Sequence, residues 1–80
     1  WKTIKDMNTE QRQARVNVLE NRLRELEAMD LKSLEKRDKK ELTKEVKDIN
    51  RELKRHATSG GVYISVGVLL LVIILLILLL

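Results

Sequence analysis

The charged residues of this 80-residue chain are confined to one part of the sequence, and this separation limits what the chain can fold into. All 16 Lys and Arg residues and all 12 Asp and Glu residues lie between Lys2 and Arg55. From residue 60 onwards only the Tyr63 phenol can ionise, and residues 67–80 are Gly, Val, Leu and Ile alone. The chain therefore has two parts suited to different solvents, and its average composition does not class it as globular.

The apolar C-terminal segment, residues 62–80, has the length of a membrane-spanning helix. Its 19 residues would extend about 28 Å as a helix, and the hydrocarbon core of a bilayer is about 30 Å thick. Leu, Ile and Val favour insertion and outweigh the hydroxyl of Ser65. We therefore expect one C-terminal transmembrane helix. Arg51, Lys54 and Arg55 precede it, and because basic flanks stay on the cytoplasmic side, the N-terminal part is expected in the cytoplasm.

Small residues surround the start of this segment. Gly61 and Ser65 are four residues apart, a spacing that lets two membrane spans approach closely, and Gly67 adds a third small side chain. The sequence of residues 58–61 is Thr-Ser-Gly-Gly, which is also typical of a flexible hinge. Two interpretations of these small residues remain open: they pack one membrane span against another, or they form a flexible joint before the span.

Apolar residues of the charged part form two narrow stripes with spacings of three and four residues. They are Val16, Leu19, Leu23 and Leu26, and then Leu42, Val46, Ile49 and Leu53. On one straight helix, at about 100° per residue, the two stripes would face nearly opposite directions. A break within the charged residues 30–40 solves this and predicts helices at about 9–29 and 38–56, with Leu34 covering the turn. We expect an antiparallel hairpin, and a bent or continuous helix in a parallel coiled coil is the alternative.

The chain is thus expected to be all-α, with a charged helical region (1–57), a hinge (58–61) and a transmembrane helix (62–80). Two helices with apolar residues in single file bury little surface, whereas ordering the backbone costs about 1 kcal/mol or more per residue. The stripes are therefore the expected packing interface with a second copy or a partner membrane protein. Membrane lipid is the other expected partner.

Charge and residue types exclude most other classes of function. Residues 36–55 hold nine basic and five acidic residues, an excess that favours anionic headgroups next to the membrane. Acids interleave with these bases and aromatic residues are scarce, so nucleic-acid binding is not expected. Without Cys, a phosphate-binding loop or metal-ligand spacing, we expect no enzyme, cofactor, metal or small-molecule substrate. The lone His56 is interpreted as a cation at a helix C-terminus.

One longer stretch carries a resemblance. Residues 31–47 are rich in Leu, Lys and Glu, and Gly-Gly-Val-Tyr-Ile-Ser-Val-Gly at 60–67 leads into an unbroken Leu, Ile and Val tail. This combination resembles small uncharacterised bacterial membrane proteins that are tail-anchored by a single span. The resemblance implies the bacterial inner membrane and no particular activity.

The function expected from the sequence is that of a non-catalytic, tail-anchored helical adaptor or small accessory subunit at the cytoplasmic membrane face. The alternative is a self-oligomerising, membrane-active protein of the holin-like or toxin-like kind. Both place residues 62–80 in a membrane, and they differ in whether the stripes or the spans make the decisive contacts.

Overall fold

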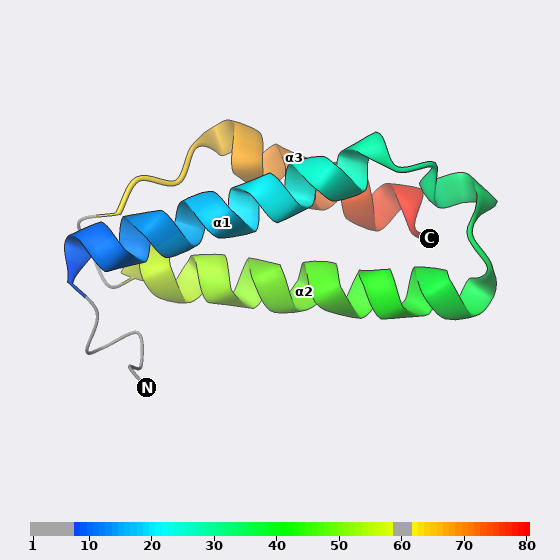
Figure 1. Ribbon diagram of the computed structural model, residues 1–80, viewed down its shortest axis with the longest axis horizontal. Coiled ribbons are helices and arrows are strands. Elements are labelled where there is room, and N and C mark those ends of the chain that lie inside the picture. Colours follow the sequence, from blue (N-terminus) through cyan, green and yellow to red (C-terminus); the bar gives the residue numbers. More distant parts are fainter. Residues whose placement is uncertain (1–7, 59–61) are drawn as a thin grey trace.

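The computed structural model describes residues 8–58 and 62–80, and this part of the chain forms three α-helices and one short 3₁₀ helix (Figure 1). In chain order they are α1 (Thr9–Ala28), η2 (Leu31–Ser33), α2 (Lys36–Thr58) and α3 (Val66–Leu78). The described residues include no strand. The prediction of an all-α fold is confirmed for these residues.

Local hydrogen bonds explain where α1 begins and ends. The Gln11 backbone N–H donates to Asn8 Oδ1 at 2.8 Å, and the Asn8 N–H donates to Gln11 Oε1 at 3.1 Å, so the cap satisfies two otherwise free donors. At the other end Met29 is extended, and Ser33 Oγ donates to Asp30 Oδ2 at 2.6 Å in the turn that follows. This turn separates α1 from α2, so the two stripes lie on separate helices.

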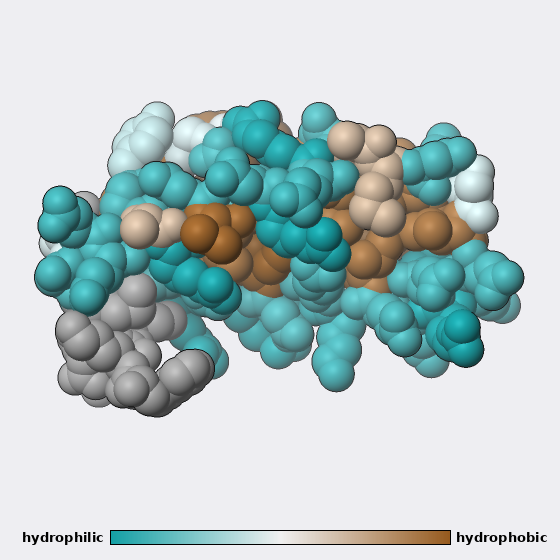
Figure 2. Space-filling model, in the orientation of Figure 1, coloured by the Kyte–Doolittle hydropathy of each residue, from teal (hydrophilic) through white to brown (hydrophobic). Residues whose placement is uncertain are grey.

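α1 and α2 run antiparallel (Figure 1), and their apolar stripes belong to one core. Figure 2 shows apolar side chains, in brown, between the hydrophilic side chains above and below them. The buried residues of the two helices are Val16, Leu19, Leu23 and Leu26 on α1 and Val46, Ile49, Leu53 and His56 on α2. Leu31 of η2 is buried at the turn end, next to the half-buried Leu34. The packing follows from the spacing, because positions three and four apart share one face of a helix.

α3 packs against both α1 and α2 and completes one core (Figure 1). Its buried face consists of Val68, Leu71, Val72 and Leu75, continued by Leu79. The two stripes alone offer little apolar surface, and a partner was expected to supply the rest. In the structure the C-terminal segment of the same chain lies on the stripes and supplies it.

The expected transmembrane helix at residues 62–80 is not found as such. α3 begins at Val66 and has 13 residues. Ser65 is its N-cap and accepts a hydrogen bond from the Val68 N–H at 3.3 Å, so residues 62–65 stay outside the helix. Within residues 8–58 and 62–80, no helix combines the length and the apolar character needed to cross a membrane.

Candidate functional site

The surface of α3 that points away from α1 and α2 is apolar and uncovered. We call it the outer face of α3, and it consists of Val66, Leu69, Leu70, Ile73, Ile74 and Ile77. Between 43% and 70% of each of these residues is exposed, and the spacing of three and four residues makes them one continuous stripe. A helix that is apolar all round is normally buried all round, and an exposed apolar patch marks an interaction site.

A contact 50 residues apart in sequence fixes the entry into α3. Gln13 Nε2 donates to the Tyr63 carbonyl at 3.1 Å, and the Tyr63 N–H donates to Gln13 Oε1 at 2.9 Å. The side-chain amide of Gln13 thus pairs with one backbone unit as a neighbouring strand would. This Gln13–Tyr63 contact ties the residues before α3 to the first half of α1.

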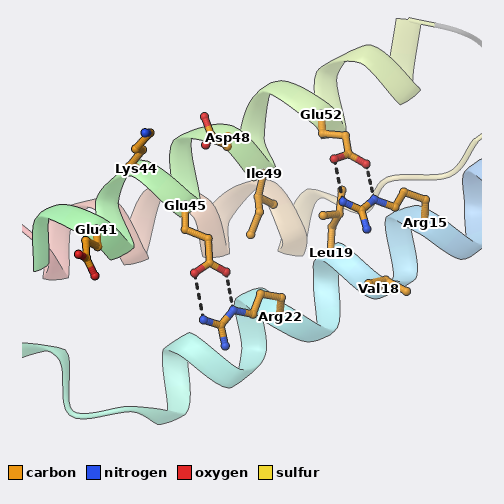
Figure 3. Close-up of a pocket in the computed structure, with 10 residues that line it drawn as sticks. All are labelled: Arg15, Val18, Leu19, Arg22, Glu41, Lys44, Glu45, Asp48, Ile49 and Glu52. Atoms are coloured by element: carbon orange, nitrogen blue, oxygen red, sulfur yellow. Dashed lines mark hydrogen bonds and ion pairs between the residues drawn. The ribbon is translucent and has the colours of Figure 1, made fainter. Parts of the chain in front are cut away.

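Two ion pairs join α1 to α2 on the side drawn in Figure 3. Arg15 donates to both carboxylate oxygens of Glu52, at 2.5 and 3.0 Å, and Arg22 donates to both oxygens of Glu45 at the same distances. Arg22 follows Arg15 by seven residues on α1, and Glu45 precedes Glu52 by seven residues on α2. Each ion pair is bidentate, and together the two pairs fix the register of α1 against α2.

The cavity around these pairs measures about 550 Å³ and lies between α1 and α2. Its wall includes the apolar side chains of Val18, Leu19 and Ile49, and its polar side chains include the paired groups (Figure 3). Because each of the two guanidinium groups already has a carboxylate, these four charges neutralise one another. We assign the cavity a structural role.

The ion pairs change the pKa values of their members. The hydrogen bond from Arg22 lowers the pKa of Glu45, and the hydrogen bond from Arg15, supported by one from His56, lowers the pKa of Glu52. Partial burial opposes both shifts. The same hydrogen bonds raise the pKa values of Arg15 and Arg22, so all four groups stay charged at neutral pH.

Stability is therefore expected to fall in acid. The pKa values of Glu45 and Glu52 are lower in the folded chain than their ordinary 4.5, so the unfolded chain binds protons more readily. The stabilisation is complete above the ordinary pKa and is lost as the pH falls through the lower, folded values. Denaturant titrations at a series of acidic pH values measure this slope. The slope should weaken in Arg22→Gln and persist in Arg24→Gln, which removes an ion pair within α1; equal slopes in both variants would contradict the assignment.

His56 lies in the core and not on the solvated end of α2. Its side chain is fully buried, and Nε2 lies 3.3 Å from Glu52 Oε2. Within the described residues Nδ1 has no hydrogen-bond partner. The spacing explains the position, since His56 follows Leu53 by three residues and continues the buried stripe of α2. His56 thus stands in the last turn of α2, as the sequence predicts, and its imidazole is buried beside a carboxylate.

A second cavity, about 1260 Å³ in volume, runs along the exposed side of α2 to the end of α3. We call it the basic groove. Lys36, Arg37, Lys39, Lys40, Lys44, Lys47 and Arg51 line it, together with Glu41, Thr43, Asp48, Leu79 and Leu80. Lys54 and Arg55 are exposed near the end of α2, beyond the groove. The sequence places the basic excess in residues 36–55, and the structure shows that seven of these nine cations line one groove.

The predicted packing residues lie inside the chain. Val16, Leu19, Leu23, Leu26, Val46, Ile49 and Leu53 are buried in the common core, and Leu34 and Leu42 are half-buried against it. The surface that the sequence assigned to a partner is therefore occupied, in this structure, by α3. A partner could reach it only after α3 moves away.

Two of the three small residues predicted to pack two spans, Ser65 and Gly67, lie next to each other at the start of α3. Gly61 lies outside the described residues, and Ser65 is used as the cap of α3. Gly67 is exposed in the first turn, where an added Cβ would meet only Ser65 Oγ, at 3.7 Å. The outer face of α3 could not be predicted from the sequence, because a segment in which every residue is apolar has no periodicity that separates its two sides.

The described residues show no metal chemistry, and similarity does not assign a function. Within residues 8–58 and 62–80, no group of three His, Cys, Asp or Glu side chains could hold a metal ion. Comparisons with protein families, with curated proteins and with solved structures gave no match to this chain. The outer face of α3 and the basic groove are the surfaces on which a function can be argued.

Proposed function

We propose that this chain is a non-catalytic helical adaptor that is tail-anchored in a membrane through residues 62–80. The observation that carries the proposal is the outer face of α3, an apolar stripe that the rest of the described chain leaves uncovered. A bilayer is the solvent that suits it, because Leu and Ile each favour insertion by about 0.3–0.6 kcal/mol. The charged surface of α1 and α2 favours water, so these helices stay outside the bilayer.

In this proposal α3 has two positions. In the docked position, which the structure represents, its inner face covers the stripes of α1 and α2. In the inserted position, residues 62–65 join α3 to make a helix of about 19 residues, long enough to cross a bilayer of about 30 Å. The inner face then exchanges its contacts with α1 and α2 for lipid chains.

Insertion of α3 uncovers the stripes, and this supplies the adaptor function. Leu23 and Leu53 become partly exposed, and a helix of a partner membrane protein or of a second copy of this chain can pack on them as α3 did. The ion pairs from Arg15 and Arg22 keep α1 and α2 together in both positions. The basic flank and the resemblance to bacterial single-span proteins support a cytoplasmic hairpin at the bacterial inner membrane.

A second candidate is a self-oligomerising, membrane-active protein. The outer face of α3 supports it, because the same stripe could pack against α3 of another copy. The uniform apolar composition of residues 66–80 argues against an aqueous pore, which needs a polar lining. Leakage of a dye trapped in vesicles would favour this second candidate over the adaptor.

Flotation of the full chain with phosphatidylcholine vesicles tests the proposal. Because these vesicles carry no net charge, binding must come from apolar contact. We expect the chain to float with the vesicles, without dye leakage. A chain that stays in the bottom fractions would contradict membrane anchoring through α3.

A further inference from the structure

We propose that the basic groove binds the anionic headgroups of membrane phospholipids, an inference that rests on the proposed membrane anchoring. The groove lies between the exposed side of α2 and the end of α3. It combines a row of cations with an apolar end formed by Leu79 and Leu80. The seven cations of the row are not among the buried core residues.

The charge of the groove is uncompensated. Seven Lys and Arg residues line it against two acids, Glu41 and Asp48, and Asp48 pairs with Arg51 at 3.3 Å. Within the described residues no carboxylate pairs with the other six cations, Lys36, Arg37, Lys39, Lys40, Lys44 and Lys47. On the adjoining side of α2, which faces α1, Glu45 and Glu52 by contrast neutralise the guanidinium groups of Arg15 and Arg22. A surface with this much excess positive charge attracts anions.

The row of cations has a regular geometry. Lys36, Lys40, Lys44, Lys47 and Arg51 follow one another at intervals of four or three residues, which keeps them on one side of α2. A row of this kind matches a surface that carries many anionic groups better than it matches one small anion. The volume of about 1260 Å³ also exceeds what one phosphate group would occupy.

The apolar end of the groove identifies the source of the anions. Leu79 and Leu80 close it, and Leu80 follows Ile77 of the outer face by three residues. While α3 is docked, a bilayer that touches its outer face therefore meets the groove at Leu80, so the groove binds headgroups before α3 inserts. The cations of the groove belong to α2 and stay beside the headgroups after insertion. Phospholipids offer an anionic headgroup next to an apolar chain, which fits both parts of this surface.

Two variants of equal net charge test the proposal in vesicle flotation with the full chain. Lys40→Gln/Lys47→Gln removes two cations from the groove, whereas Lys32→Gln/Arg24→Gln removes two exposed cations outside it. Vesicles contain phosphatidylcholine alone or a mixture with phosphatidylglycerol. Each cation near an anionic surface is worth about 1 kcal/mol, so the groove variant should bind the mixed vesicles roughly 10- to 30-fold more weakly than the wild type. Its binding to neutral vesicles should not change, and the control should lose less than about threefold.

The possible outcomes separate the two proposals. Equal loss in both variants, or wild-type binding that phosphatidylglycerol does not strengthen, would overturn the groove while leaving anchoring intact. Binding to mixed vesicles only would overturn anchoring by the outer face and support the groove. Added inorganic phosphate at constant ionic strength should not displace the chain, and displacement would show a site for the free anion instead. Failure to bind either vesicle would overturn both proposals.

Discussion

Replacing Leu23 with alanine is expected to lower the free energy of unfolding by about 2–5 kcal/mol. Leu23 is fully buried on α1 and belongs to the core shared by the three helices. The substitution removes its apolar contacts and leaves a cavity that the packed helices fill only in part. Because a single core in a chain of this size supplies only about 3–5 kcal/mol of net stability, most of the folded population should be lost.

Leu70→Ala is the matched control, since it removes the same atoms from a residue that is 53% exposed on α3. Its effect in lipid-free solution should stay within about 0.5 kcal/mol. Denaturant titration followed by far-ultraviolet circular dichroism measures both variants, at concentrations that keep the chain monomeric. Equal losses in the two variants would contradict the division of apolar residues between core and outer face.

Replacing Ile73 with aspartate is expected to abolish membrane anchoring and leave the docked fold intact. Ile73 is 54% exposed and lies in the middle of α3, so a carboxylate there remains in water when α3 is docked. At the centre of a membrane helix, aspartate costs about 3 kcal/mol, and the favourable contribution of isoleucine is lost as well. The sum corresponds to a fall of more than about 100-fold in binding to neutral vesicles.

The control for this variant is Asn21→Asp, which adds the same charge to an exposed position of α1. It should float with neutral vesicles as the wild type does, and circular dichroism should show all three proteins equally helical without lipid. If Ile73→Asp floats normally, anchoring does not use α3. If it unfolds without lipid, position 73 is not on an uncovered surface.

Much of the fold can be predicted from particular residues. The spacing of Leu19, Leu23 and Leu26 predicts α1, and the different angular position of Val46 and Ile49 predicts that a turn must follow it. The predicted start of this helix at about residue 9 agrees with α1, whose cap is Asn8. The periodicity of each helix and the turn between them depend on residues close together in the sequence, and the structure has both.

The position of α3 could not be predicted in the same way. Residues 68–80 are all Leu, Ile or Val, so no pattern shows which side faces α1 and α2 or whether the segment leaves them at all. The pairing of Glu45 and Glu52 with α1 was missed because only the register of the two helices brings these groups together. A second copy or a partner membrane protein on the stripes stays a prediction; in this structure the C-terminal segment of the same chain covers them.

The measurement that tests the central claim most directly is the distance between α1 and α3 with and without a membrane. The chain has no cysteine, so Glu27→Cys and Ile77→Cys, both at exposed positions near the ends of these helices, give two unique sites for spin labels. Without lipid, pulsed electron paramagnetic resonance should give one short, narrow distance, as the docked α3 requires. On phosphatidylcholine vesicles the distance should become longer and broader, because α3 leaves α1 and α2 to enter the bilayer. An unchanged short distance on vesicles that carry the chain would contradict the release of α3 and, with it, the uncovering of the stripes for a partner.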